Sequence, residues 1–527
     1  AEGNVLERHY VHWHCSPTRR SLLTGRLPVH HGELLSQVQT DDIDLRWSWI
    51  SDKLKKANYS THWYGKGHTG YKSFNHLPIN HGFDHHTGFL TGAQDYFSDD
   101  RWEGDQPLRN DTEYSTQLYG HRAVDALQRH DPSTPLFMFL PFQAVHSPYE
   151  APKHASGGSV LQEMLRASDH MVGKLVVQLK EKKMWDDTLI IFSADNGGVS
   201  EGNNFPLRGE KHTNWEGGMR AAAFVSGGLV PTALRGTRNK DTLHIVDWYP
   251  TLCNLAGVDP HDNPPIPPLP VDPSDPTKDI YGKKSYPAVD GVDIWPLLTK
   301  SANPSRTSLV LSNEVYIQGD LKLIVSQPNP DWMSANYVNN GWKTKGQVWT
   351  CANGQPAETP ECAGDEVEYG CNKYTDRTDF QPCLFNVTAD VEERHNLAKE
   401  QPALVTELWK QLNLTMLTKF HSRSPSSLLG PCESRCPPPC CCPNDPGPLS
   451  LCPANLLSFS HLPCRRLVSL SHTSLSPTPL SCISPHCVPP LSPSNSCAGA
   501  QHVWAKFDPP GEKKTPDGPI CGVPQCK

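Results

Sequence analysis

The chain has 527 residues, with 48 Lys and Arg against 56 Asp and Glu, so its formal net charge is -8. Nucleic-acid and anionic-membrane binders normally show a basic surplus, so this balance argues against both classes of partner. The sequence contains no apolar run long enough to span a bilayer, which argues against a transmembrane segment. Hydrophobic residues make up 37 % of the chain, and this low fraction predicts that part of it does not fold.

In chain order, the first 310 residues alternate short apolar runs with amphipathic stretches. A helix is predicted at Val160–Trp185, with an apolar face that includes Leu165 and Val172. The predicted strands, three of them buried, are Tyr59–Tyr64, Leu136–Phe142, Thr188–Ser193 and Ala221–Val225. Continuous apolar strands that alternate with helices predict an α/β domain with a largely parallel sheet over residues 1–310.

The rest of the chain changes character twice. Residues 311–420 are expected to form a smaller α+β domain, with a strand at Leu321–Val325 and a closing helix at Pro402–Phe420. Four cysteines cluster there, and we expect disulfides among them with open connectivity: Cys351, Cys362, Cys371 and Cys383. Residues 421–527 hold 21 of the 50 prolines and 12 of the 18 cysteines without lasting periodicity, which predicts a disordered tail. Its middle, residues 433–498, resembles translated non-coding sequence.

Four Asn-X-Ser/Thr sequons predict glycosylation at Asn58, Asn110, Asn386 and Asn413. Glycosylation would place the protein in the secretory pathway, although residues 1–14 do not read as a signal peptide.

The stretch from Cys15 to Arg26 (CSPTRRSLLTGR) has the signals of a short helix that begins at the cysteine. Pro17 suits the first turn of a helix, where its missing N–H costs nothing, and Gly25 suits the end. Cys15 would then lie among the free N–H groups of a helix N-terminus, which attract anions, and Arg19 would add a cation one turn further. For an arbitrary cysteine, a buried structural residue before a helix would be the more ordinary interpretation.

Further polar residues follow the predicted strands. Lys66 and His68 come after the first strand, and His146 comes after the strand that ends at Phe142. Asp195 and Asn196 follow the strand that ends at Ser193, and Lys211 comes soon after. Because α/β sheets place ligands at the carboxyl ends of their strands, we expect these side chains to converge in one crevice. Taken singly, each residue is more ordinarily a turn residue, a hydrogen-bonded histidine or a solvated lysine.

These motifs, in this order, resemble the sulfatase family over about residues 1–420. Cys15 to Arg26 matches the signature C-x-P-x-R followed by L-L-T-G-R, and the segment from Gly82 to Ser98 looks closest to the arylsulfatase B type. The resemblance implies an alkaline-phosphatase-like sandwich: a large, mixed, mostly parallel sheet, a smaller C-terminal α+β domain, and here the tail. It also implies a sulfuric ester hydrolase, lysosomal or extracellular, whose substrate is a sulfated glycan.

The resemblance also implies roles for individual residues. Cys15 would be converted to formylglycine by the formylglycine-generating enzyme, and one hydroxyl of the hydrated aldehyde would attack sulfur with help from Asp195. His146, together with Lys211, would assist the leaving alcohol. His68 would accept the proton of the other hydroxyl, and Arg19 and Lys66 would hold the diol. Asp195, Asn196 and the modified Cys15 would bind one Ca²⁺.

One part of the family pattern is absent from residues 1–14, namely a paired Asp-Asp on the first strand that completes the metal site. We therefore expect a chain truncated at its N-terminus, with weak calcium binding and little activity. A catalytically impaired protein that binds sulfated glycans remains an alternative. A phosphomonoesterase of the related fold is a third reading, which Cys15 disfavours because that class uses Ser or Thr as its nucleophile.

Overall fold

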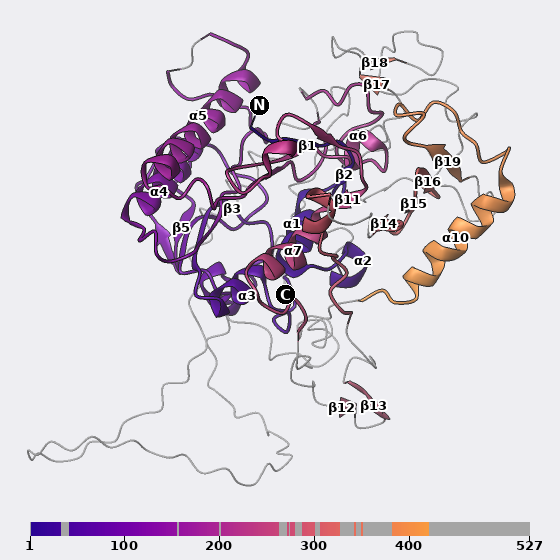
Figure 1. The fold of residues 1–527 in the computed structure, drawn as a ribbon, viewed down its shortest axis with the longest axis horizontal. Coiled ribbons are helices and arrows are strands. Elements are labelled where there is room, and N and C mark those ends of the chain that lie inside the picture. The colour runs from indigo at the N-terminus through magenta and orange to yellow at the C-terminus, as the bar shows by residue number, and fades with distance from the viewer. Residues whose placement is uncertain are drawn as a thin grey trace, which may run out of the picture. The chain divides into compact units, whose positions relative to one another are not determined.

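The computed structural model describes residues 2–32, 42–154, 157–199, 202–262, 271–272, 275–279, 287–300, 306–326, 342–343, 349–350, 371 and 382–420. The predicted tail, Cys351, Cys362 and most of the Pro-rich stretch before residue 287 lie outside these residues. Residues 1–423 form one compact unit (Figure 1). The domain boundary predicted near residue 310 stays a prediction. No helix in the described ranges is long and apolar enough to cross a membrane.

Two mixed sheets dominate the N-terminal part of this unit. The first has the order β6–β5–β4–β3–β7 and consists of β3 (Ser60–Lys66), β4 (His85–Phe89), β5 (Arg101–Glu103), β6 (Gln106–Leu108) and β7 (Leu136–Phe139). The second has the order β10–β1–β9–β8 and consists of β1 (Asn4–Leu6), β8 (Ile190–Ser193), β9 (Ala223–Ser226) and β10 (Arg238–Asn239). Strand β3 pairs in parallel with both β4 and β7, whereas β9 runs antiparallel to both β1 and β8.

Strands β7 and β8 differ from the sequence expectation, which made them longer and buried. Both lie at the edge of their sheets, so one side of each strand has no hydrogen-bonded neighbour among the described strands. Their side chains are accordingly half-buried, and Phe192 of β8 is 45 % exposed. An unbroken apolar run indicates burial only when the strand is covered on both faces, and an edge position removes part of that cover.

Helices flank the sheets. Helix α4 (Ser115–Arg129) packs against α5 (Val160–Glu181), and Figure 1 shows the two side by side. Gly120 allows the close approach, because a Cβ there would lie 2.4 Å from the side chain of Met171. The predicted apolar face of α5 is only partly right: Met164 is buried, but Leu165 is 59 % and Val172 37 % exposed. The capping box of Ser159 and Gln162 fixes the start of this helix.

The remaining helices in the described ranges are short, apart from α10. The α-helices are α1 (Cys15–Thr24), α2 (Pro28–His31), α3 (Ile50–Lys56), α6 (Glu216–Met219), α7 (Trp248–Leu255), α8 (Trp295–Leu298) and α10 (Pro402–Met416). The 3-10 helices are η1 (Phe74–His76), η2 (Pro78–Asn80), η3 (Thr232–Leu234) and η4 (Ile245–Asp247). Three strand pairs stand apart from the larger sheets: β2 (His9–Tyr10) with β11 (Leu243–His244), β12 (Val271–Asp272) with β13 (Asp275–Asp279), and β17 (Trp342–Lys343) with β18 (Trp349–Thr350).

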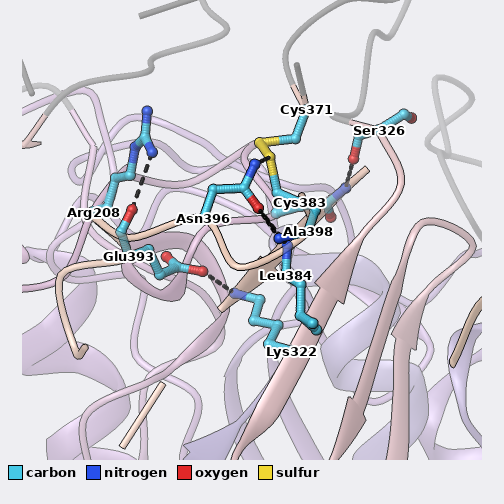
Figure 2. The surroundings of a disulfide bond; sticks show 10 residues. Arg208, Lys322, Ser326, Cys371, Cys383, Leu384, Glu393, Asn396 and Ala398 are labelled. Carbon is cyan, nitrogen blue, oxygen red and sulfur yellow. Dashed lines mark hydrogen bonds and ion pairs between the residues drawn. A yellow bond between two sulfur atoms is a disulfide. The ribbon is translucent and has the colours of Figure 1, made fainter. Parts of the chain in front are cut away.

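An antiparallel C-terminal sheet follows, with the order β14–β15–β16–β19. Its strands are β14 (Ser308–Ser312), β15 (Val315–Gln318), β16 (Leu321–Ile324) and β19 (Cys383–Asn386). Helix α10 covers one face through Val405, Leu408 and Leu412. Apolar side chains of this sheet share a core with Tyr10, Trp215 and Met219, so the C-terminal sheet packs against the N-terminal part. A disulfide joins Cys371 to Cys383, and it anchors the first residue of β19 (Figure 2).

Candidate active site

Helix α1 begins at Cys15, as the sequence predicts. His14 before it has extended backbone, and Gly25 ends the helix in the left-handed region, where its φ of 69° suits a residue without a side chain. The Cys15 thiol is buried and lies 3.0 Å from Nδ1 of His68, which follows β3. Burial alone would raise the pKa of the thiol, but nearby Lys66, His14 and Lys211 outweigh it and lower that pKa to about 6.

Arg19 and Lys66 meet Asp195 beside the thiol. The guanidinium of Arg19 donates two hydrogen bonds to Oδ2 of Asp195, from Nε at 2.9 Å and from Nη2 at 2.7 Å. Nζ of Lys66, the last residue of β3, lies 4.0 Å from the same oxygen. Burial would raise the pKa of Asp195, but the cations, Arg19 foremost, hold it well below its usual range. This carboxylate is therefore ionised across the physiological pH range.

Lys211 and His146 form a second pair. Nδ1 of His146 lies 2.7 Å from the carbonyl oxygen of Ser147, so that nitrogen donates and Nε2 is left as an acceptor. Nζ of Lys211 lies 3.2 Å from this Nε2 and donates to it. Burial and the neighbouring Lys66 and Lys211 lower the pKa of His146 well below its ordinary value, so the ring is neutral. The pair is a hydrogen-bonded lysine and imidazole, suited to passing a proton.

The expected metal ligands show one feature that fits a cation. Oδ1 of Asn196 is buried and accepts no hydrogen bond from the protein, while Nδ2 of the same side chain donates to the carbonyl of Gly197 at 2.9 Å. A buried carbonyl oxygen without a donor beside the ionised Asp195 is the oxygen chemistry that Ca²⁺ prefers. Within the described residues, no group of three or more His, Cys, Asp or Glu side chains is arranged to hold a metal ion.

Backbone hydrogen bonds connect these parts. The N–H of Lys211 donates to the carbonyl of Gly198 at 3.2 Å, and the N–H of Gly197 donates to Gly218 at 3.0 Å. The loop after β8 is therefore fixed to the segment that contains Lys211. The six side chains that the sequence placed in one crevice lie in this region together with Cys15 and Arg19, and most of them are joined by these contacts and by their mutual effects on pKa. We call seven of these eight, all except Asn196, the catalytic cluster: Cys15, Arg19, Lys66, His68, His146, Asp195 and Lys211.

His14, which belongs to none of the motifs named above, also lies in this region. Its ring meets His68 edge-on, with centroids 5.5 Å apart, and tilts against His212 at 5.4 Å. The one feature of the sequence that could have pointed to His14 as a site residue is its position directly before Cys15. A histidine at the N-cap position of a helix is usually structural, so that signal is weak.

Comparisons with known proteins identify the family to which this chain belongs. The family model described as Sulfatase matches residues 1–258. Arylsulfatase J of Mus musculus is 30 % identical over 469 residues, which cover 81 % of this chain and 72 % of that protein. N-acetylgalactosamine-6-sulfatase of Mus musculus is 26 % identical over 442 residues and covers 76 % of each chain.

Solved structures share the fold at lower sequence identity. Ps i-CgsB, solved in complex with k-i-k-neocarrahexaose, superimposes with a TM-score of 0.58 at 22 % identity, over 81 % of this chain and 88 % of that chain. The PsFucS1 sulfatase from Pseudoalteromonas sp. gives a TM-score of 0.57 at 20 % identity, over 80 % and 84 % of the two chains. The fold is thus the alkaline-phosphatase-like fold of sulfatases. The chain belongs to the sulfatase family, and it is a hydrolase of sulfate esters.

Proposed function

We propose that this protein hydrolyses sulfate esters of sulfated sugars at Cys15, after that residue has been oxidised to formylglycine, with one Ca²⁺ at Asp195 and Asn196. The observation that supports this most strongly is the position of Cys15: a buried helix N-terminus ringed by three cationic side chains. The name of one relative, N-acetylgalactosamine-6-sulfatase, supports the sugar substrate.

Binding of the substrate follows from charge. Arg19, Lys66 and Lys211 are largely buried, and once Cys15 has become uncharged formylglycine, only Asp195 opposes them among the members of the catalytic cluster. A sulfate ester carries one negative charge and several acceptor oxygens, so it would reduce the surplus of positive charge. Attraction between charges is stronger in a site that excludes water than in bulk solvent, which favours an anionic group here.

The residues around the thiol can move the protons that hydrolysis requires. When oxidised, Cys15 would supply a hydrated aldehyde with two hydroxyls. The first would attack sulfur, and the second would lose its proton so that sulfate is released. In this structure Sγ of Cys15 marks the place of the two hydroxyl oxygens. His68 is neutral, because burial and then Lys66 lower its pKa, and its Nδ1 is placed to accept the proton of the second hydroxyl. The ionised Asp195 orients and deprotonates the first hydroxyl.

Lys211 and His146 serve the leaving group. An alcohol leaves poorly as an alkoxide, so a proton donor beside the bridging oxygen lowers the barrier. Lys211 would donate a proton from Nζ, and Nε2 of His146, which already accepts a hydrogen bond from Nζ, keeps the lysine oriented.

Calcium would be held by Oδ1 of Asn196, which accepts no hydrogen bond from the protein, and by the carboxylate of Asp195, and it would act as a Lewis acid on a sulfate oxygen.

A second candidate function is a sulfatase-like protein that binds sulfated glycans with little turnover. It is favoured by the lack of a third acidic, histidine or cysteine ligand around Asp195 and Asn196 in the described ranges.

A secretory location, lysosomal or extracellular, is part of the proposal. The side chains of Asn58, Asn110 and Asn413 are exposed, as glycosylation requires. Oδ1 of Asn386 accepts N–H groups from Thr388 and Ala389, whereas a glycan is attached through Nδ2, so we propose glycan attachment at Asn386 as well. In that pathway the formylglycine-generating enzyme would be the partner that modifies Cys15.

The test is expression in a secretory host with the formylglycine-generating enzyme. We expect mass spectrometry to find formylglycine at Cys15 and the protein to release 4-nitrocatechol from its sulfate in a calcium-dependent way. Binding of a sulfated glycan without turnover, in protein that carries formylglycine, would support the second candidate. An unmodified Cys15 thiol at full occupancy would overturn the proposed mechanism.

A further inference from the structure

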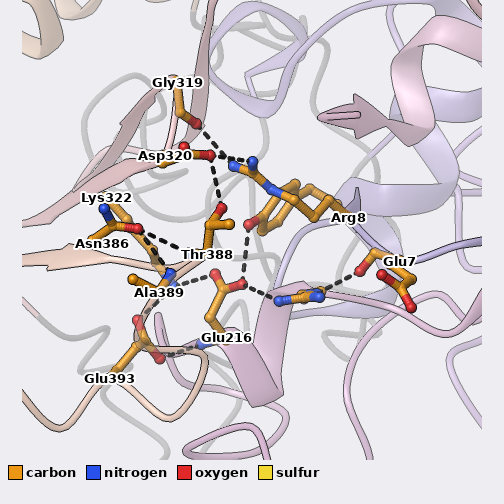
Figure 3. Close-up of polar contacts among 12 residues, drawn as sticks. Glu7, Arg8, Glu216, Gly319, Asp320, Lys322, Asn386, Thr388, Ala389 and Glu393 are labelled. Carbon is orange, nitrogen blue, oxygen red and sulfur yellow. Dashed lines mark hydrogen bonds and ion pairs between the residues drawn. The ribbon is translucent and has the colours of Figure 1, made fainter. Parts of the chain in front are cut away.

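The loop that contains Lys211 is held at both ends by a single residue of the segment after β19. Nη1 of Arg208, at the start of the loop, donates to the backbone carbonyl of Glu393 at 3.2 Å (Figure 2). The N–H of Glu216, at the end of the loop, donates to Oε2 of the Glu393 side chain at 2.7 Å (Figure 3). Glu393 therefore spans the loop, with Lys211 between the two points of attachment.

The same loop is hydrogen-bonded to the segment that follows Asp195 and Asn196. The N–H of Lys211 donates to Gly198, and the carbonyl of Gly218 accepts from Gly197, as described above. Side-chain Nδ2 of Asn204 bridges the carbonyls of Gly198 and Gly209 at 2.9 and 3.1 Å. A shift of the loop ends would thus move Lys211 together with the segment after Asp195.

The side chain of Glu393 belongs to a closed group of charges, the acid cluster, which consists of Glu216, Lys322 and Glu393. Nζ of Lys322 lies 3.0 Å from Oε1 of Glu216 and 3.0 Å from Oε1 of Glu393. All three side chains have an exposed fraction of 0 %. Two carboxylates share one ammonium group in a place that water does not reach, and this arrangement disfavours the ionisation of both acids.

The two acids are not equivalent, because Glu216 has more donors. Oε2 of Glu216 also accepts from the hydroxyl of Tyr10 at 3.0 Å, and Nη1 of Arg220 lies 3.6 Å from it. Burial would raise the pKa of Glu216, but Lys322 and Arg220 outweigh it and the pKa is lowered. Burial, reinforced by the charge of Glu216 and opposed by Lys322, raises the pKa of Glu393 to about 7. The cluster's exchangeable proton therefore resides on Glu393.

Other charged groups around the cluster are already paired. Arg8 is hydrogen-bonded to Asp320 at 2.7 Å, and Arg394 forms an ion pair with Glu392 at 2.5 Å. Arg220 also donates to the carbonyl of Glu7. Arg208 stacks on Trp215, with its Cζ 3.7 Å from the ring centroid. Burial and Glu216 raise the pKa of Tyr10 well above its ordinary value, so Tyr10 stays a neutral donor. Among the groups described here, Glu393 is the one poised to change its charge near neutrality.

We propose that Glu393 is a positioning residue of the sulfatase: as an uncharged acid it holds the Lys211 loop in its working position, and its ionisation loosens that loop. This inference rests on the proposed role of Lys211. With Glu393 protonated, the carboxylate of Glu216 faces Lys322 through Oε1 and Arg220 through Oε2. An ionised Glu393 adds a second negative charge that has only Lys322 as its cation and no solvent to screen it. The raised pKa of Glu393 shows that burial and repulsion from Glu216 outweigh the stronger hydrogen bond that the ionised carboxylate would accept from the N–H of Glu216, so ionisation strains the loop end.

The direction with pH follows from linkage. The pKa of Glu393 in the folded protein, about 7, lies above the ordinary carboxyl value, so the folded state binds the extra proton. The contribution of this proton to the stability of the folded state is fully present below about pH 4.5 and is lost as the pH rises through about 7. Between these values the unfolding equilibrium constant rises by at most about tenfold per pH unit. The sulfatase should therefore work best in an acidic compartment.

The test compares the wild-type protein with Glu393→Gln, which keeps the shape and the acceptor oxygen but cannot ionise. Two readouts are measured at about pH 5 and about pH 8: kcat on an alkyl sugar sulfate, whose leaving group needs the proton from Lys211, and hydrogen–deuterium exchange of the 207–218 peptide, corrected for the intrinsic exchange rate. The protonated fraction of Glu393 falls about tenfold between these values, so the wild type should lose about tenfold of its kcat. Its protection should fall further, by up to about 10²-fold, because the linked opening equilibrium changes over about two pH units. The variant should lose neither through this transition.

Two further variants complete the experiment. Glu392→Gln, whose side chain is one-third exposed beside Arg394, is the matched control and should follow the wild type at each pH. Glu216→Gln removes the opposing carboxylate, so Glu393 pairs with Lys322 and protection should stay high at the upper pH. Equal pH profiles of exchange in the wild type and Glu393→Gln would overturn the inference, whatever the activity. Absence of turnover in every protein, with the exchange difference intact, would overturn the proposed function while leaving the proton-dependent hold on the loop supported.

Discussion

The catalytic cluster and the acid cluster are both buried groups of charges, but their surpluses have opposite signs. In the catalytic cluster three cationic side chains surround one carboxylate, Asp195. In the acid cluster two carboxylates surround one cation, Lys322. The first lies beyond strand ends, where Asp195 is partly exposed, and the second is closed on every side. Burial alone therefore does not distinguish a ligand site from a structural one.

The sign of the surplus decides what each cluster takes up. Excess positive charge lowers the pKa of Cys15 to about 6 and favours the binding of an anion. Excess negative charge raises the pKa of Glu393 to about 7 and favours the uptake of a proton, which needs no open channel from solvent. If this comparison is right, substitutions in the first cluster should change chemistry, and substitutions in the second should change pH dependence.

The largest effect should come from Cys15→Ala. Loss of the residue that forms the nucleophile should lower kcat by about 10³-fold or more. Because the cations remain, the variant should still bind inorganic sulfate with an affinity close to that of the wild type, measured by calorimetry. Cys253→Ala is the control: this thiol is also buried, but burial raises its pKa to about 12, and its loss should leave turnover unchanged. Loss of sulfate binding in Cys15→Ala would show that the cations alone do not make the anion site.

Lys211→Met should have the next largest effect. Without the proton donor, kcat on an alkyl sugar sulfate should fall by about 10²-fold, and kcat on 4-nitrocatechol sulfate, whose leaving group needs no proton, should fall much less. Lys174→Met, on the exposed side of α5, controls for the loss of a lysine. Equal losses on both substrates would assign Lys211 to sulfate binding rather than to the leaving group.

The sequence predicted the catalytic cluster better than the sheets around it. Cys15 to Arg26 contains the helix start, the helix end and the proposed nucleophile in one segment, so local signals were sufficient. Lys66 and Asp195 were singled out because each lies at the end of a strand, although β3 and β8 belong to different sheets and not to the one parallel sheet that was expected. The exposure of Phe192 and Leu165 was missed, since an apolar run in a sequence does not show which strands and helices lie beside it.

The acid cluster could not be predicted in the same way. Its members lie on α6, on β16 and in the segment after β19, and Glu216 and Glu393 are 177 positions apart. Buried Glu and Lys residues look like surface residues in a sequence, and the tertiary packing of the C-terminal sheet on Trp215 is what removes them from water.

Removal of the Cys371–Cys383 disulfide should have a smaller and purely structural effect. The bond closes a loop with a sequence separation of 12, for which chain entropy predicts about 3 kcal/mol of stabilisation. Cys383 begins β19, which pairs with β16 through Lys322 and Phe385. The double variant Cys371→Ala/Cys383→Ala should unfold at lower denaturant concentration but keep its kcat at about pH 5. A selective loss of kcat there would show that the disulfide, and not only Glu393, positions the Lys211 loop.

The smallest effect should be that of Asn196→Ala on calcium. Removal of the buried Oδ1 takes away one oxygen ligand and should weaken Ca²⁺ binding by about tenfold, or about 1.4 kcal/mol. The measurement is the calcium concentration that half-restores turnover after chelation, with Asn254→Ala, an exposed residue bonded to Asp293, as the control. A bound cation would add to the positive surplus of the catalytic cluster, so calcium should also tighten sulfate binding. Unchanged calcium dependence in Asn196→Ala would mean that the orphan oxygen serves the substrate directly, and the anion site would then depend on the side chains alone.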